Sequence, residues 1–404
     1  LMVELLDEYI PAIEGSELND DPLKPLSFQA KSLVAEMGDN TPIRWIHRND
    51  RYTEKLATPD VSVADLIGDI DPIKAANLKL SYSDERAIHF GLVPHANRGI
   101  FVMNELPDLQ PRIQVALFNI LQEGDIQIRG FKVRLPLDIH FVFTANPEDY
   151  TNRGAIITPL KDRIQSQIIT HYPNNIEISK SITRQEAKID QQSRNAVIIP
   201  ALIENLIEEV VEAARESEFV DQKSGVSSRL GISAYECLTA AAELRSIESG
   251  DKNTVARISD LMAIVPAITG KVELVYEGEQ EGAVQVAHNL IRLAIRKEFI
   301  KQFLNPERLK RKDAVSPYQP VIDWFSNNQF ELESDATEAQ YETALLTLKP
   351  LVSLVDKTLG KLEKSETVLM CEFVLHALAE YSLISKTNYS GRLKFNDMLS
   401  AMLN

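Results

Sequence analysis

Two short apolar segments of the chain are each followed by a side chain that could take part in catalysis. Gly99–Met103 is an apolar run, and Glu105 follows it after Asn104. The segment 139–145 is also apolar, and Asn146 ends it. Such runs are typical of buried parallel strands, whose carboxyl ends form the sheet edge where ligands bind in open α/β folds. A carboxylate there can deprotonate a water molecule, and an amide can hydrogen-bond to that water and to a phosphate.

Both residues also have a purely structural interpretation. Glu105 could cap a helix that follows it. Asn146 precedes Pro147, and an asparagine before proline is common in turns. From the residues alone, the turn is the better interpretation of Asn146, so a catalytic role needs further support.

The elements around these residues predict an α/β fold. Apolar positions within 108–122 have the spacing of an amphipathic helix, and Asp108 is its expected cap. Residues 125–135 alternate in polarity around Arg129 and Gly130, which predicts a hairpin. The order strand, helix, hairpin, strand predicts a parallel sheet with helices on its faces.

Beyond residue 175 the sequence has helical patterns and no strong strand pattern. These patterns cover 196–216, 229–247, 254–268, 282–304, 338–359 and 365–386, with a polar stretch at 305–337. We therefore expect three parts: an α/β core at 1–175, a helical lid at 176–275 and a helical C-terminal extension at 276–404.

Several segments, in order and with the right spacing, resemble the AAA+ ATPases of the magnesium-chelatase I subunit and MoxR family. They are Gly91–Leu106, similar to the approach to the Walker B strand; Phe143–Glu148, similar to sensor 1; Pro159–Ile164, similar to the arginine segment; Val226–Gly231, similar to the start of the sensor 2 helix; and the upstream pieces at 14–22 and 58–68. The resemblance covers residues 1–275. It implies an AAA+ core with a parallel sheet, an all-α lid, ATP and Mg²⁺ as cofactors, and a ring, expected to be a hexamer.

The resemblance also implies a role for each residue at the predicted sheet edge. Glu105 would orient and deprotonate the attacking water. Asn146 would contact the γ-phosphate and that water. Asn104 and Glu105 stand where the family holds magnesium.

Three arginines would complete such a site. Arg163 would be the arginine finger that faces the nucleotide of the next subunit, and Arg153 is a second candidate. Arg229 would contact nucleotide from the lid of the same chain. The structural alternatives are ion pairs, of Arg163 with Asp162 or a nearby acid and of Arg229 with Glu243 or a similar acid.

Two insertions mark this branch of the family. Residues 69–91 resemble its insert in helix 2, and 125–135 resemble its hairpin before sensor 1. Both would carry nucleotide-driven motion to a pore or a partner. Alternatively, they only cover an edge of the sheet.

The chain departs from the family first in its phosphate-binding loop. It has no G-x-x-x-x-G-K-[S/T] motif, and the nearest pieces, at 270–271 and 391–392, fail the spacing. As written, the chain should bind ATP poorly. Leu1–Tyr9 has helical spacing without a cap and resembles the helix after that loop. We therefore expect an N-terminal truncation before or at the Walker A loop, which the full-length protein would supply.

The second departure is Asn104, where the family has an aspartate. An amide there carries no negative charge, so the site loses an attraction to the dication that is on the order of a few kcal/mol. Asp108 could compensate, and Glu105 remains. We therefore expect a slow ATPase.

Composition restricts the partners. The formal net charge is −16, so nucleic acid and anionic membranes should be repelled unless a basic patch exists. The segment 297–312 is the best basic cluster and is typical of a solvated helix face. Cys237 and Cys371 lack metal-ligand spacing, which favours the reducing cytoplasm.

The leading functional hypothesis is an ATPase that remodels a partner protein or a metal-chelatase complex, with a von Willebrand factor A-domain protein as the expected kind of partner. The alternative is a nucleotide-responsive scaffold that hydrolyses ATP weakly. A transcription-activating AAA+ protein would need a GAFTGA-type loop, which the sequence lacks. The acidic charge disfavours DNA contact, and with it a replicative helicase.

Overall fold

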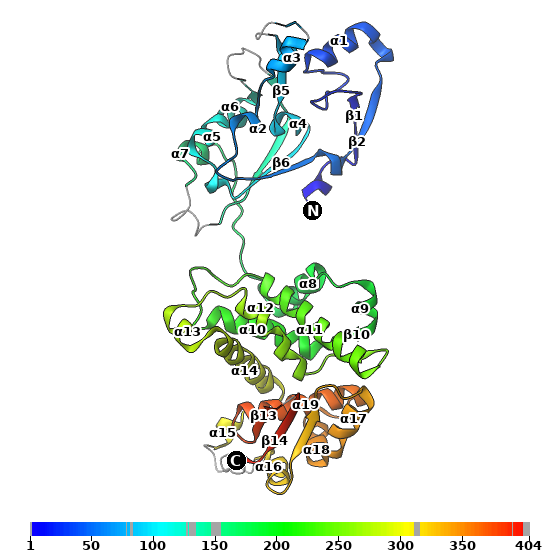
Figure 1. Ribbon diagram of the computed structural model, residues 1–404, viewed down its shortest axis with the longest axis vertical. Helices are drawn as coiled ribbons and strands as arrows, with labels where there is room; N and C mark the ends of the chain where they lie inside the picture. Colours follow the sequence, from blue (N-terminus) through cyan, green and yellow to red (C-terminus); the bar gives the residue numbers. More distant parts are fainter. Residues whose placement is uncertain are drawn as a thin grey trace. The chain divides into compact units, whose positions relative to one another are not determined.

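The structure of the chain, a computed structural model, divides into two compact units, Leu1–Ile169 and Thr170–Asn404 (Figure 1). It describes residues 2–77, 79–80, 84–126, 128, 135–146, 155–310, 316–389 and 391–398. Each unit has its own hydrophobic core. The division lies close to residue 175, where the sequence changes character.

A parallel sheet of three strands forms the centre of the first unit. The strands are β3 (Tyr52–Leu56), β6 (Gly99–Asn104) and β9 (Ile139–Phe143), with β6 in the middle. A β-carbon at Gly99 would lie 2.3 Å from the carbonyl oxygen of Arg51, so glycine is needed where the two chain segments approach. The predicted parallel sheet is confirmed.

Alternate residues of β6 enter the core of the first unit. Phe101 and Met103 are fully buried, and they share one cluster with Ile113 of α5 (Pro111–Ala116) and Leu160 of α7 (Thr158–Lys161). The rings of Phe101 and Phe141 meet edge to face at 5.8 Å between centroids, which links β6 to β9. This packing fixes the two strands whose ends carry the candidate site.

The helix expected at 108–122 is two short helices. They are α5 and α6 (Phe118–Glu123), and Leu117 separates them. Asp108 is not the cap, because it belongs to a 3-10 turn at Leu106–Asp108 and α5 begins after Gln110. Pro111 fixes that start, since proline suits the first position of a helix and has no N–H to donate. The prediction for Asp108 was therefore wrong.

The helical pattern at Leu1–Tyr9 is also largely overturned. Only Met2–Leu5 forms a 3-10 turn, and Tyr9 begins strand β1 (Tyr9–Ile13). This strand pairs antiparallel with β2 (Ile43–His47). Proline at position 11 cannot donate the hydrogen bond that a continuing helix requires, whereas an edge strand tolerates it.

The two predicted insertions are partly described. Strands β7 (Asp125–Ile126) and β8 (Leu135–Pro136) pair antiparallel, as the hairpin prediction requires, and its tip lies outside the described residues. In the other insertion, β4 (Gly68–Ile70) pairs antiparallel with β5 (Ile88–Phe90). The remaining helices of the first unit are α1 (Phe28–Met37), α2 (Val63–Leu66), α3 (Pro72–Asn77) and α4 (Leu92–His95).

The second unit begins with the predicted lid helices. Its elements up to residue 281 are α8 (Ile176–Glu186), α9 (Gln191–Ala196), β10 (Val197–Ile198), α10 (Ala201–Glu216), α11 (Arg229–Ser249), β11 (Thr254–Val255), α12 (Val265–Thr269) and α13 (Tyr276–Glu281). Pro200 is the N-cap of α10. Among the described residues, no helix is both long and apolar enough to cross a bilayer.

The expected extension shares one core with the lid. Its elements are α14 (Ala283–Gln302), α15 (Pro306–Lys310), α16 (Gln319–Phe325), β12 (Phe330–Glu333), α17 (Glu338–Thr347), α18 (Lys349–Leu359), α19 (Lys364–Glu380), β13 (Ser385–Tyr389) and β14 (Arg392–Asn396). Phe299 of α14 is fully buried, and its ring lies 6.0 Å from that of Phe373 in α19. Because α14 packs against both α10 and α19, the division expected at residue 275 falls within a continuous core.

The extension also contains a sheet that was not predicted. Strands β12, β14 and β13 form an antiparallel sheet in that order, and Phe330 faces Phe395 across it. Residues 330–333 alternate between buried and exposed, which is a strand pattern within the stretch taken as polar. The extension is therefore mostly, but not wholly, helical.

Candidate functional site

The structure brings the ends of β6 and β9 to the same edge of the sheet. The strands run parallel with Met103 opposite Phe143, and the Thr144 N–H donates to the Met103 carbonyl at 3.0 Å. Glu105 is the first residue after β6, and Asn146 follows β9 after two residues. The two predicted residues therefore leave adjoining strands at the edge where the sequence placed them.

Glu105 has an unusual backbone conformation. Its φ is 53° and its ψ is 51°, the left-handed region, which costs a non-glycine residue roughly 1–2 kcal/mol. Its N–H donates to Thr144 Oγ1 at 3.1 Å. Although Glu105 occupies the cap position of a 3-10 turn, its side chain makes no capping bond, and within the described residues its carboxylate has no hydrogen-bond or ion-pair partner. The capping interpretation therefore does not account for this carboxylate.

Asn104, in contrast, has two side-chain partners. Its Nδ2 donates to Glu54 Oε1, and its Oδ1 accepts from Thr144 Oγ1 at 3.2 Å. The other carboxylate oxygen of Glu54 accepts from the Tyr52 hydroxyl at 2.8 Å. Sequence analysis missed Glu54, because only the pairing of β3 with β6 brings residues 54 and 104 together.

Asn146 is exposed, and the next residue lies outside the described part of the chain. The turn interpretation of Asn146 with Pro147 therefore falls partly outside the described residues, as does Arg153. Asn146 itself is free of side-chain partners within the described residues, so its amide is open to solvent at the sheet edge.

Arg163 lies against its own unit. Its Nε donates to Gln122 at 3.1 Å, one terminal nitrogen donates to the Pro159 carbonyl at 2.7 Å, and its guanidinium lies over the Phe118 ring at 4.8 Å. The side chain is half-buried. The expected alternative, an ion pair with Asp162, is not found among the described residues.

Arg229 is the first residue of α11 in the second unit and is exposed. Within the described residues its guanidinium has no partner. Glu243, its expected structural partner, instead accepts from Ser193 at 2.8 Å.

The oxygen donors at the sheet edge suit a hydrated magnesium ion. Glu54, Asn104 and Glu105 supply carboxylate and amide oxygens, the hard donors that Mg²⁺ prefers, and Mg²⁺ commonly uses one or two carboxylates while it keeps several waters. No group of three or more histidine, cysteine or acidic residues in the described ranges is arranged to hold a metal by itself. The edge fits an ion that arrives with further ligands.

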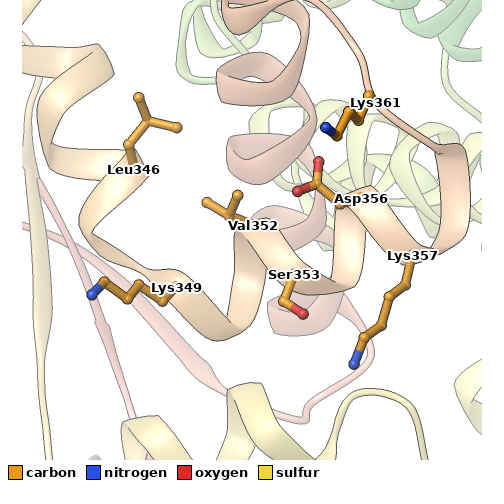
Figure 2. A pocket seen from close by; sticks show the side chains of 7 residues that line it. All are labelled: Leu346, Lys349, Val352, Ser353, Asp356, Lys357 and Lys361. Atoms are coloured by element: carbon orange, nitrogen blue, oxygen red, sulfur yellow. The ribbon is translucent and has the colours of Figure 1, made fainter.

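A hollow on the surface of the second unit does not resemble a nucleotide site. It has a volume of about 430 Å³ and lies along α18, the last turn of α17 and the turn after α18. Its lysines, Lys349, Lys357 and Lys361, point in different directions in Figure 2. Phosphate recognition needs donors that converge on one point, so this hollow does not replace the missing loop.

Two sequence comparisons match parts of this chain to known proteins. Residues 77–169 match the family described as the Sigma-54 interaction domain, a stretch that includes Asn104, Glu105, Asn146 and Arg163. The chain is also 25% identical over 147 residues to the magnesium-chelatase 38 kDa subunit of Cereibacter sphaeroides. That match covers 35% of this chain and 43% of the subunit, so the chain spans less than half of the relative's length.

Two solved structures show weaker similarity. A complex between subunits BchI and BchD of magnesium chelatase has a chain that is 18% identical, with 69% of this chain and 84% of that chain covered at a TM-score of 0.31. NtrX from Brucella abortus in complex with ADP is 14% identical, with coverage of 62% and 53% and a TM-score of 0.35. At such TM-scores the relationship rests on the two sequence matches. By those matches, the chain is related to the AAA+ ATPases of the magnesium-chelatase and MoxR type.

Proposed function

We propose that this protein is an AAA+ ATPase that couples ATP binding and hydrolysis to the remodelling of a partner protein or a metal-chelatase complex. One observation supports this most strongly. The Glu105 carboxylate has no partner within the described residues, its backbone is held in the left-handed region, and Asn146 follows the adjoining strand. A left-handed backbone is uncommon for a residue other than glycine and is often found at functional sites, and a general base must be free to meet its water.

Each candidate residue has a distinct role in this proposal. Glu105 orients the attacking water and accepts its proton, and the Asn146 amide hydrogen-bonds to the water and the γ-phosphate. Asn104 and Glu105 face the magnesium ion that accompanies ATP, which would neutralise charge on the phosphates. Arg229 contacts the nucleotide from the lid.

Arg163 acts on the nucleotide of a neighbouring subunit in this proposal. Its contacts with Gln122 and Pro159 leave one terminal nitrogen without a partner within the described residues. Stacking on Phe118 holds the guanidinium half-exposed and restricts its rotamers, which lowers the entropy lost when it binds an anion.

Nucleotide binding also needs a phosphate-binding loop, which these 404 residues do not contain. Strand β9 has no partner on its outer side among the described residues, so a further strand can pair there. We expect the chain alone to bind ATP poorly.

The assembly and its location are further parts of the proposal. We propose a cytoplasmic ring, most simply a hexamer, because an arginine that acts in trans needs a neighbouring copy. A von Willebrand factor A-domain protein is the proposed partner for remodelling. The expectation that the protein binds neither nucleic acid nor membrane rests on its net charge of −16.

Asn104 favours the alternative, a scaffold that binds ATP but hydrolyses it slowly. Its amide supplies no negative charge, and both its polar groups are already bonded within the protein. The two functions differ in turnover and not in nucleotide binding.

Phosphate release separates them. We would measure it on this chain and on the protein that its gene encodes, each with and without Glu105→Gln. The motor hypothesis predicts Mg²⁺-dependent turnover in the encoded protein and a loss of about a hundredfold or more in the variant, since general bases contribute about 10²–10⁴-fold. ATP binding with turnover that Glu105→Gln leaves unchanged would favour the scaffold, and an encoded protein that binds no ATP would refute both.

A further inference from the structure

A chain of hydrogen bonds crosses all three strands of the parallel sheet at its carboxyl edge. The Glu105 N–H donates to Thr144 Oγ1 at 3.1 Å, and the Thr144 hydroxyl donates to Asn104 Oδ1 at 3.2 Å. The Asn104 amide group then donates to Glu54 Oε1. The chain begins at the backbone of the proposed general base and ends on a carboxylate of β3.

The donors and acceptors in this chain permit only one orientation of the Asn104 amide. An ionised carboxylate only accepts, so Nδ2 of Asn104 must face Glu54. Oδ1 then faces Thr144, whose single hydroxyl proton it accepts. The hydroxyl oxygen remains free to accept from Glu105, as observed. Every link therefore pairs one donor with one acceptor.

Glu54 places a negative charge beside the position where the related family has one. In the register of β3 and β6, Leu56 is opposite Asn104 and Glu54 is opposite Val102, so Glu54 and Asn104 are diagonal neighbours on one side of the sheet. Glu54 is exposed, and its second oxygen accepts from Tyr52. Desolvation and this bond to Glu54 raise the pKa of Tyr52, which keeps its hydroxyl a donor.

We propose that Glu54 supplies the negative charge that position 104 lacks and positions the Asn104 amide toward the water shell of a bound magnesium ion. In this chain the acid is then Glu54 on β3, whereas the related family has its acid at the position of Asn104 on β6. This inference rests on the proposed function, because it deepens the same site. It also implies that an aspartate at 104 would place two carboxylates in contact, which is unfavourable without a cation.

Moving the carboxylate from position 54 to position 104 tests the proposal. We would titrate Mn²⁺, a paramagnetic substitute for Mg²⁺, into the complete chain and follow water-proton relaxation. Glu54→Gln should weaken binding by about tenfold or more, as for other residues that support a metal ligand. Adding Asn104→Asp to Glu54→Gln should restore it, because the carboxylate returns on the other strand. Glu36→Gln, which removes an exposed charge in α1, controls for net charge.

Thermal unfolding, measured first without metal and then with Mg²⁺, provides a second test. Asn104→Asp alone should lower the unfolding midpoint, millimolar Mg²⁺ should recover it, and Glu54→Gln in the same chain should also recover it. Equal Mn²⁺ binding by wild type and Glu54→Gln would overturn the role of Glu54 and leave the proposed function intact. A wild-type chain that binds no Mn²⁺ would overturn this inference, whereas the effect of Glu105→Gln on phosphate release would still decide the proposed function.

Discussion

Arg245 in the second unit and Glu105 in the first are both charged, yet their surroundings differ. Arg245 is 6% exposed and donates to Asp260 at 2.9 Å and to Glu338 at 3.2 Å. It also donates to Thr254 at 2.8 Å and to the Val255 carbonyl at 2.9 Å. The Glu105 carboxylate has none of these partners within the described residues, although its backbone is firmly held.

The difference indicates which charged groups serve the fold and which are available to a ligand. A buried charge is tolerated only if its partners satisfy it, and the partners of Arg245 come from η7 (Ser259–Ile264), β11 and α17. These bonds connect α11 to η7, β11 and α17 within the second unit. At the sheet edge, Asn104 bonds to Glu54, but the Glu105 carboxylate has no partner within the described residues. That carboxylate is therefore available to a ligand.

Glu372 extends the same pattern in the second unit. It is fully buried and accepts from the Tyr341 hydroxyl at 2.7 Å and from the backbone N–H groups of Ile258 and Ser259 at 2.8 and 3.1 Å. Burial raises the pKa of its carboxyl group. Since α19 thereby binds the start of η7, this acid has a structural role.

Among the substitutions that test this contrast, removal of Arg245 should have the largest effect on stability. Arg245→Met should lower the free energy of unfolding by about 3–5 kcal/mol, because Asp260 loses its buried ion-pair partner and Glu338 keeps only Arg257. Urea unfolding followed by circular dichroism would measure it. Arg86→Met, which breaks an exposed pair with Asp84, is the matched control and should change little. Equal effects of the two substitutions would show that burial does not distinguish these groups.

A buried histidine gives the second test. Burial, and then the charge of Lys386, hold the pKa of His376 well below its usual value. Below about pH 6.5 the unfolded chain therefore binds a proton that the folded chain does not, so stability falls by about 1.4 kcal/mol per pH unit as pH drops. Glu372, 3.8 Å away, has a raised pKa and acts in the opposite sense, losing stability as pH rises.

Unfolding of wild type and His376→Leu at pH 7.5 and pH 5.5 would isolate the histidine contribution. The wild type should lose more stability on acidification than the variant. Exposed His171, changed to leucine, serves as the control. Parallel pH profiles for wild type and His376→Leu would mean that His376 is not held neutral in the folded protein.

Relieving the backbone strain at Glu105 should have the smallest effect on stability, and it should stabilise the protein. Glu105→Gly should stabilise the first unit by about 1 kcal/mol relative to Glu105→Ala, because glycine adopts the left-handed conformation without the strain of a β-carbon. Both variants lose the carboxylate, so their difference reports the backbone alone. If the alanine variant were as stable as the glycine variant, the site would store no strain.

Part of the fold could be predicted from apolar patterns. The runs at Gly99–Met103 and 139–145 became β6 and β9, because fully buried strands leave a continuous apolar signal. Strand β3 was missed, since its residues alternate only between exposed and half-buried. The helix at 108–122 was predicted without its break at Leu117, which tertiary packing decides.

The sequence by itself determined that an acid follows one buried strand and an amide follows the next, because those positions depend only on local order along the chain. Tertiary structure alone decided that Glu54 meets Asn104, that Glu105 adopts a left-handed backbone, and that Arg163 stacks on Phe118. These contacts join residues about 40 to 50 positions apart, or depend on the strand pairing around them. Strand register, which a single sequence does not reveal, therefore determines how the candidate site is assembled.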